Sequence, residues 1–346
     1  MKRALLGMLS CPACSRDLTL EAAEEVNGDV ESGELACVGC LARYPVLRSV
    51  PRFVPPENYA RNFGFQWNRF RQCQLDSHLG QPISRERLLR QSGWHPEDLQ
   101  GKAVLDIGCG AGRFAEVALA LGARVVAVDY SDAVDACWEN FGPHPHLEVM
   151  QADMRALPLR AGQFDYVYCL GVLQHTPDVR RSFLSLPPML RPGGRFAVDI
   201  YPRTGLEWLW PKYWIRPLTK RVDQQRLLKI VEAVAPALLA VSDLLGRVPV
   251  VGRRLRYLVP VANYRGVQPL TDDQLLEIGI LDTFDMLAPA HDHPQTARTL
   301  TRWFAGTALV DVEVYRDGQL IGRATKGYGA SDDRDGPGWR SPTDST

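Results

Sequence analysis

The 346-residue sequence lacks two features: a long hydrophobic run and an excess of charge of one sign. No apolar run approaches the roughly 18 to 20 residues that span a bilayer, which argues against a transmembrane protein. Forty Lys and Arg residues balance forty Asp and Glu residues. The resulting net charge of zero gives no overall attraction to nucleic acid or to an anionic membrane, although it leaves local patches and peripheral membrane contact open.

The first ten residues, MKRALLGMLS, resemble a secretory signal only superficially. Their apolar stretch is shorter than the core of a signal peptide and runs directly into a cysteine motif. We therefore expect a cytoplasmic protein. The length of the chain allows one large α/β domain together with a smaller unit.

The segment Val104–Phe114 carries the most informative pattern of the sequence. An apolar run leads into three glycines, Gly108, Gly110 and Gly112, and a helical pattern follows. Strand, glycine turn and helix form the nucleotide-binding corner of a doubly wound α/β sheet. Asp106 stands just before the glycines, where its carboxylate would repel a pyrophosphate and attract an ammonium or sulfonium group. The pattern therefore favours S-adenosylmethionine over a dinucleotide.

Three motifs follow one another along the chain: Asp106-x-Gly108-x-Gly110-x-Gly112, Val125-Val-Ala-Val-Asp129-Tyr-Ser, and Gln151-Ala-Asp153. In this order they resemble the cofactor-binding motifs of class I S-adenosylmethionine-dependent methyltransferases. The resemblance covers roughly residues 60–200 and resumes near 295–326. It implies a Rossmann-like α/β fold with a seven-stranded sheet.

The resemblance also implies which side chains bind the cofactor. Asp129 ends the second predicted strand, where an acidic side chain can accept both ribose hydroxyls. Asp153 matches the residue that meets the adenine amino group in the family, and Met154 matches the apolar residue beneath the ring. The expected cofactor-binding residues are Asp106, Gly108, Cys109, Gly110, Gly112, Asp129, Tyr130, Ser131, Asp153, Met154, Leu170 and Gln174.

Methyl transfer asks little of a protein beyond alignment of the acceptor, because the sulfonium already activates the methyl group. A base is needed where a hydroxyl or amine must lose its proton, and histidine suits that role. His175 is the leading candidate because it follows the fourth predicted strand, with contact to the cofactor as the alternative role. His293 is the second candidate catalytic residue. By resemblance, Asp285, His291 or His293 is expected to orient acceptor or cofactor.

Four cysteines near the N-terminus form two C-x2-C pairs: Cys11, Cys14, Cys37 and Cys40. Four thiolates at this spacing suit structural zinc in a ribbon, with iron or two disulfides as alternatives. Disulfides are disfavoured because the other four cysteines are scattered, mostly in apolar segments. Residues 41–55 resemble the small zinc-ribbon proteins that activate certain RNA and protein methyltransferases. A four-cysteine site has no position left for substrate, so we expect a structural role or docking of a protein partner.

The long segment between the fifth strand and the last helix is expected to select the substrate. It opens with Trp208, Trp210, Tyr213 and Trp214, and a helical stretch at 227–245 is predicted to be interrupted by Pro236. We favour a helical cap whose aromatics fill its own core, over a lid or interfacial patch for a hydrophobic acceptor. The expected layout is a zinc ribbon at 1–56, a methyltransferase domain at 57–201 and 294–328, a helical insertion at 202–293 and a disordered tail at 329–346.

These features predict an enzyme that methylates a hydroxyl or amine of a small-molecule acceptor, with hydrophobic acceptors included. A second hypothesis makes the acceptor an RNA or protein presented through the zinc ribbon, and a third makes the chain a non-catalytic scaffold that binds the cofactor. A strong nucleic-acid signal is missing because the net charge is zero. A dehydrogenase is disfavoured by Asp106 and by Arg113, which stands where a dinucleotide motif would continue with glycine.

Overall fold

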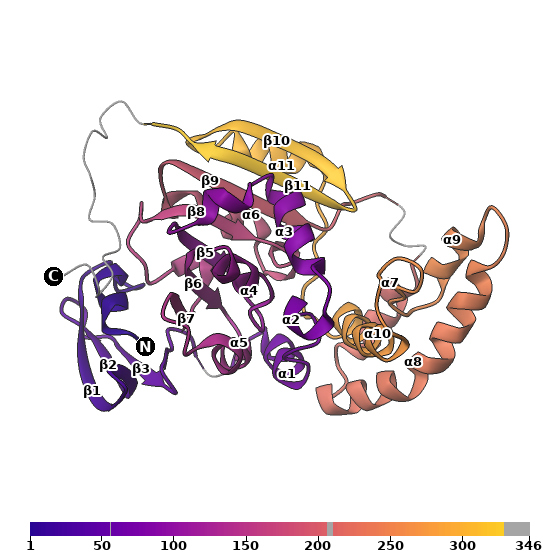
Figure 1. The fold of residues 1–346 in the computed structure, drawn as a ribbon, viewed down its shortest axis with the longest axis horizontal. Coiled ribbons are helices and arrows are strands. Elements are labelled where there is room, and N and C mark those ends of the chain that lie inside the picture. Colours follow the sequence, from indigo (N-terminus) through magenta and orange to yellow (C-terminus); the bar gives the residue numbers. More distant parts are fainter. Residues whose placement is uncertain (56, 206–209, 329–346) are drawn as a thin grey trace.

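A seven-stranded sheet lies at the centre of the computed structural model, which describes residues 1–55, 57–205 and 210–328 (Figure 1). The strand order is β10-β11-β9-β8-β5-β6-β7. Neighbouring strands from β9 to β7 are parallel, whereas β11 is antiparallel to both β9 and β10. This arrangement confirms the doubly wound α/β fold predicted from the sequence. The strands are β5 (Ala103–Ile107), β6 (Arg124–Asp129), β7 (Leu147–Gln151), β8 (Phe164–Cys169), β9 (Leu190–Ile200), β10 (Leu309–Asp317) and β11 (Gln319–Lys326).

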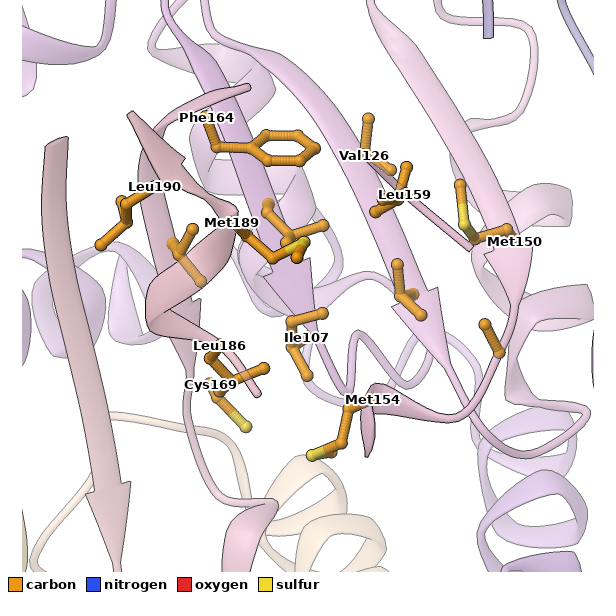
Figure 2. Packing of buried hydrophobic residues seen from close by; sticks show 14 of the residues in the cluster. Ile107, Val126, Met150, Met154, Leu159, Phe164, Cys169, Leu186, Met189 and Leu190 are labelled. Atoms are coloured by element: carbon orange, nitrogen blue, oxygen red, sulfur yellow. The ribbon is translucent and has the colours of Figure 1, made fainter. Parts of the chain in front are cut away.

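Helices cover both faces of this sheet because its central strands are apolar on both sides. All five residues of β5 are buried, with Val104 in the cluster on one face and Leu105 in the cluster on the other. One face packs on α3 (Ile83–Ser92), α4 (Arg113–Ala120) and α5 (Ala133–Phe141), the other on α6 (Val179–Leu184) and α11 (Ala297–Phe304). Figure 2 shows part of the second cluster, in which Ile107 and Val126 point toward Leu159 and Met189.

Short 3-10 helices connect these elements. They are η1 (Arg3–Met8), η2 (Pro96–Leu99), η3 (Met154–Ala156), η4 (Leu173–His175), η5 (Pro187–Met189) and η7 (Arg256–Leu258). Two of them, η3 and η4, follow β7 and β8 at the carboxyl edge of the sheet, where ligands of this fold class bind.

A second sheet is formed by the N-terminal residues. Its strands run in chain order: β1 (Leu18–Val26), β2 (Asp29–Cys37), β3 (Arg43–Leu47) and β4 (Val50–Pro51). Val30, Leu35 and Val46 belong to the same buried cluster as one face of the central sheet. The guanidinium of Arg52 donates to Oε1 of Gln151 at 3.0 Å, at the end of β7. The N-terminal sheet is therefore packed against the central one and shares its core.

The insertion contains α7 (Pro211–Thr219), α8 (Gln224–Gly246), α9 (Gly252–Leu255) and α10 (Asp272–Leu287). It lies at the opposite end of the molecule from the N-terminal sheet (Figure 1). Together with α1 (Arg61–Arg69) and α2 (Asp76–Leu79) it builds a third apolar cluster, which includes Phe70, Leu227, Val231 and Phe284. None of the helices in the described residues combines the length and apolar character needed to cross a membrane.

Two expectations for the insertion are wrong. Pro236 does not interrupt α8, which continues through it as one helix of 23 residues. Trp210 and Trp214 do not fill a core, because both are exposed; the side chains of α1, α8 and α10 fill it instead. Trp208 and the tail predicted at 329–346 lie outside the described residues.

The central sheet also departs from prediction at β9. The sequence Arg191-Pro-Gly-Gly194 predicts a turn followed by a strand from Arg195, but β9 begins at Leu190 and includes these four residues. The residues at 183–190 predict a helix, whereas α6 lies earlier, at Val179–Leu184. These shifts leave the carboxyl ends of the strands, and thus the site, in place.

Candidate active site

The glycine loop lies where the strand order reverses. β5 pairs with β6 on one side and with β8 on the other, and open α/β sheets bind ligands beyond the carboxyl ends of the strands at such a point. Gly108 has a φ of +79°, and a Cβ there would lie 2.3 Å from Cγ2 of Val172. Glycine is therefore required for the loop after β5 to approach the loop after β8.

Trp67 of α1 lies against the same loop, because a Cβ on Gly110 would be 3.2 Å from its indole ring. The aromatic stretch at 62–70 thus forms a helix that packs beside α5 and α10 and places one ring over the glycine loop. This stretch therefore both packs on neighbouring helices and covers the glycine loop.

Asp106 is almost completely enclosed at the end of β5, with 1% of its surface exposed. Burial raises the pKa of Asp106 to about 7, against the smaller lowering effects of the nearby Tyr168 hydroxyl and Ala115 backbone N–H. The Oδ2 atom of Asp106 nevertheless makes no hydrogen bond of ordinary geometry among the described residues. An enclosed carboxyl group with an unused acceptor atom fits a cationic ligand next to the loop, since a nearby positive charge favours the ionised form.

Asp129 holds the glycine loop in place. Its Oδ2 accepts from the backbone N–H of Gly110 at 3.0 Å. Its Oδ1 accepts from the backbone N–H of Ser131 at 2.8 Å and from the Ser131 hydroxyl at 2.7 Å. Burial raises the pKa of Asp129. The carboxylate predicted to bind ribose is therefore fixed in orientation by two neighbouring parts of the same site.

Asp153 follows β7 and is paired with a residue that the motifs do not indicate. Arg155 donates to it through Nε at 3.0 Å and through Nη2 at 2.7 Å, while the Asp153 side chain also accepts from the backbone N–H of Arg155. Met154 between them is buried. Nearby, the ring of Tyr130 stacks on Tyr59, with ring centroids 4.8 Å apart.

The loop after β8 contains a buried amide without partners. Gln174 is fully buried, and neither its Nε2 nor its Oε1 has a hydrogen-bond partner among the described residues. Buried amides are normally paired, so this one marks a position where a polar ligand group would be satisfied. Leu170 and Cys109 are also buried beside the strand ends, so Cys109 contributes its backbone and not an accessible thiol.

His175 lies in an aromatic surrounding at the carboxyl edge of the sheet. Its Nδ1 is 3.1 Å from the carbonyl oxygen of His291. A carbonyl only accepts, so the neutral ring carries its proton on Nδ1 and leaves Nε2 as the basic nitrogen. Phe63 and Tyr201 contact the ring, at centroid distances of 5.2 and 5.5 Å.

The segment before α11 meets the loop after β8. The backbone N–H of His293 donates to the carbonyl oxygen of Gln174 at 2.9 Å, and the rings of His291 and His293 stack at 5.5 Å. The structure thus brings three of the predicted residues together: His175, His291 and His293. The fourth predicted residue, Asp285, interacts with another part of the chain: its side chain accepts a hydrogen bond from Nε2 of Gln66 in α1 at 2.9 Å.

Known proteins resemble this site and the sheet around it. The family model described as "Methyltransferase domain" matches residues 105–198, which include the glycine loop, Asp129, Asp153 and His175. The chain contains a class I S-adenosylmethionine-dependent methyltransferase domain. The match excludes the N-terminal sheet and the helical insertion.

Curated relatives of the methyltransferase domain include two proteins named ubiquinone biosynthesis O-methyltransferase. That of Coxiella burnetii is 30% identical over 123 residues, which cover 32% of this chain and 53% of the relative. That of Marinobacter nauticus is 33% identical over 117 residues, which cover 32% and 49%. The chain therefore spans about half the length of the curated relatives it matches.

Among solved structures, magnesium protoporphyrin IX methyltransferase from Synechocystis, with bound SAH, has a similar fold. The superposition has a TM-score of 0.39 at 16% identity and covers 78% of the present chain and 97% of the Synechocystis chain.

Outside the methyltransferase domain, the four N-terminal cysteines converge. The Sγ atoms of Cys11, Cys14, Cys37 and Cys40 all lie within 4.8 Å of one another. A tetrahedral zinc site with Zn–S bonds of about 2.3 Å requires sulfur atoms about 3.8 Å apart, so the four thiols fit one ion. The backbone N–H groups of Cys40 and Gly39 donate to Cys37 Sγ and lower the pKa of this thiol, whereas the neighbouring thiols raise the pKa of Cys40, so the four groups titrate as one cluster.

Several residues of the methyltransferase site carry no sequence signal of their own. Tyr59 approaches the site only through the tertiary fold, whereas Tyr201 follows β9 directly and Arg155 lies two residues after Asp153. Lys212 of the insertion donates to Oδ2 of Asp292 at 3.2 Å and lies 5.3 Å from the centroid of the Tyr201 ring. The motifs identify the residues on the sheet edge and miss those that the leader and the insertion bring to it.

Proposed function

We propose that the methyltransferase domain transfers the methyl group of S-adenosylmethionine to a hydroxyl group of a small, largely apolar acceptor. The observation that carries this proposal is the arrangement of His175, whose Nδ1–H is held by the His291 carbonyl and whose Nε2 is left as a base. The names of the curated relatives favour oxygen over nitrogen as the accepting atom. The rings of Phe63 and Tyr201 favour an apolar acceptor beside that base.

We further propose that the cofactor lies across the carboxyl ends of β5, β6 and β8. When bound, it supplies a methyl group already activated by the sulfonium. Asp106 and the unpaired amide of Gln174 would hold its methionine end, Asp129 its ribose, and Asp153 with Met154 its adenine. The glycine loop and the remaining residues, Cys109, Tyr130, Ser131 and Leu170, would complete the cradle.

His175 would act in this arrangement by orienting the acceptor and removing its proton at Nε2. The carbonyl of His291 fixes the ring and stabilises the imidazolium that forms, because a carbonyl oxygen accepts the Nδ1 proton in both protonation states. His293 supports the same loop through its backbone hydrogen bond to Gln174. We assign His293 a positioning role and His175 the role of the general base.

For the N-terminal sheet we propose one structural zinc ion bound by Cys11, Cys14, Cys37 and Cys40. The convergence of four thiols and the backbone N–H groups that donate to Cys37 Sγ support this assignment. The ion would stabilise the turns that bear the cysteines and thereby the sheet that packs on the central core.

The test is methyl transfer by the full chain to matched phenols and anilines, read by mass spectrometry of the product, with calorimetric titration of S-adenosylmethionine. We expect methylated phenols, and His175→Ala should lower kcat at least about a hundredfold, the usual contribution of a general base, while the affinity for S-adenosylmethionine changes little. His146→Ala, at an exposed histidine, is the control. Products from anilines alone would replace the hydroxyl acceptor by an amine. Loss of cofactor binding in His175→Ala would move this residue to the cofactor site.

A further inference from the structure

Positive charge is concentrated in one part of the insertion. Residues 210–265 contain eleven Lys and Arg residues and three Asp and Glu residues, a net charge of +8. Helix α10 of the same insertion carries five acidic residues and no basic one, so the whole insertion, residues 202–293, has a net charge of only +2. The excess therefore belongs to the segment with α7, α8 and α9, and a local excess of this kind attracts an anionic surface.

The same segment exposes most of the large apolar side chains that the described residues present to solvent. Twelve of the twenty exposed large hydrophobic residues lie within 210–258, about a seventh of the chain. Single exposed hydrophobic residues need no explanation, but a concentration of them marks an interaction surface.

Helix α8 shows the pattern most clearly. Four exposed residues of α8 recur at intervals of three, four or seven and therefore share one side of the helix. They are Ile230, Val234, Val241 and Leu244, and the exposed Val248 follows just after the helix. Leu228 and Val231, on the adjacent side, are buried in the insertion's own core. The helix thus has a buried apolar side and, next to it, an apolar stripe that faces solvent.

The turn after α8 continues this stripe. Val250 is fully exposed and has a φ of +66°, a conformation that a β-branched residue rarely adopts. Val248 and Val251 beside it are exposed as well, and Arg247 and Arg254 flank the three valines. The backbone strain keeps an apolar tip pointing outward between two cations, and strain of this kind is retained at functional positions.

We propose that the outer face of α8 and the turn at 247–254 dock onto an anionic membrane surface. The valines and Leu244 would enter the boundary between headgroups and acyl chains, while Arg247 and Arg254 contact lipid phosphates. Tyr257, which is exposed and stacks on Trp210 with centroids 6.2 Å apart, suits the level of the headgroups. This docking would bring the acceptor side of the methyltransferase close to membrane-dissolved molecules.

The local charge favours a membrane over a second copy of the chain as the partner of this surface. The outer stripe of α8 could also pair with the same stripe of another molecule. The turn at 247–254 carries Arg247, Arg253 and Arg254 and no acidic residue, so two copies of it repel each other, whereas anionic lipids attract it, with a contribution from each cation near the surface.

The test is co-sedimentation of the full chain with vesicles of phosphatidylcholine alone or mixed with phosphatidylglycerol. We expect binding to the anionic vesicles that weakens as salt is added. Val250→Asp with Val251→Asp should weaken it at least about tenfold, because two apolar contacts are lost and two like charges are added. Arg247→Glu with Arg254→Glu should have a similar effect. Val310→Asp, at an exposed valine of β10, is the matched control and should bind as the unmodified chain does.

The other possible results of these binding experiments would either overturn the proposal or identify a different partner. Because the readout is binding, it does not depend on methyl transfer, and failure of the proposed reaction would leave it unaffected. No binding to either vesicle, or equal binding by all variants, overturns the proposal. A dimer in light scattering that Val241→Asp with Leu244→Asp dissociates, without vesicle binding, would identify a second copy as the partner instead.

Discussion

At the scale of single residues, the enclosed carboxyl group of Asp106 makes a testable link between pH and cofactor binding. With a pKa of about 7, raised from the usual 3.8 by burial, it is largely protonated at pH 6 and largely ionised at pH 8 in the absence of ligand. A bound cation favours the ionised form. The affinity for S-adenosylmethionine should therefore increase as pH rises from 6 to 8, by up to about tenfold for each pH unit below the pKa.

Calorimetric titration at pH 6, 7 and 8, in two buffers of different ionisation enthalpy, measures both the affinity and the proton released. Asp106→Asn keeps the shape without the charge, so its affinity should be low and independent of pH. The free protein should respond in the opposite sense. Its folded pKa exceeds the unfolded one, so the contribution of Asp106 to stability is complete below pH 3.8 and is lost as pH rises through 7. An unchanged pH dependence in Asp106→Asn would assign the effect to another group.

Residues of the site differed in how well the sequence predicted them. Asp106, Asp129 and the three glycines lie in short motifs whose geometry follows from the strand-turn-helix itself. The carboxylate of Asp129 was correctly placed at the strand end, but its bonds to Gly110 and Ser131 depend on how the two loops meet. The pairing of Arg155 with Asp153 had no signal, because any exposed arginine near a carboxylate looks the same in sequence.

At the scale of elements, the turns that carry the four cysteines predict that the stability of the N-terminal sheet depends on a bound metal ion. Cys37→Ser should reduce the zinc content from one ion per chain to none, measured by elemental analysis. Because Leu35 and Val46 of this sheet belong to the core of the central sheet, loss of the ion should also lower the melting temperature by several degrees. Each kcal/mol lost shifts the melting temperature by about 2–4 °C in domains of 150–250 residues.

Cys73→Ala, which removes a thiol outside the N-terminal sheet, should leave the zinc content at one per chain. The absorption spectrum of the purified protein distinguishes iron from colourless zinc. Metal retained in Cys37→Ser, or a wild-type protein that contains none and ignores a chelator, would contradict the assignment.

Element boundaries follow from sequence where local signals are strong. β6 lies at Arg124–Asp129, where the apolar run that ends at Asp129 predicts a strand. The hairpin of β10 and β11 turns at Gly318, where the sequence Arg316-Asp-Gly318 predicts a turn. Pro236 misled the prediction, because a proline removes one helical hydrogen bond but does not outweigh the packing of a long helix. Pro236 itself lies on an exposed side of α8, so its ring does not disturb the buried core. The early start of β9 was missed because Pro192 and Gly193 resemble a turn, although they lie within the strand.

At the scale of the whole molecule, the site depends on contacts between segments that are far apart in sequence. The insertion was recognised from its length, but the exposed positions of Trp210 and Trp214 could not be predicted. An aromatic stripe has the same pattern whether it faces a core or solvent, and only the completed fold of α1, α8 and α10 decides which. Likewise, no local pattern connects Lys212 with Asp292, 80 residues later.

That connection gives a prediction about how the insertion is held against the sheet. The side chains of Lys212 and Asp292 are 9% and 4% exposed, so each is a nearly buried charge. Lys212→Met would leave the Asp292 carboxylate without its partner, and breaking a buried pair costs about 3–5 kcal/mol. The double variant with Asp292→Leu removes both charges and should recover most of that loss, because an apolar pair of similar volume is often neutral.

Urea unfolding of the wild type, both single variants and the double variant gives the coupling free energy of the pair. We expect a coupling of at least about 2 kcal/mol, within the range found for residues in contact. The exposed pair of Arg90 and Asp317, with side chains 63% and 41% exposed, is the matched control. Its cycle should give less than about 1 kcal/mol. If the two single effects at Lys212 and Asp292 simply add, the ion pair does not join the insertion to the sheet, and the apolar cluster around Phe284 alone must hold it there.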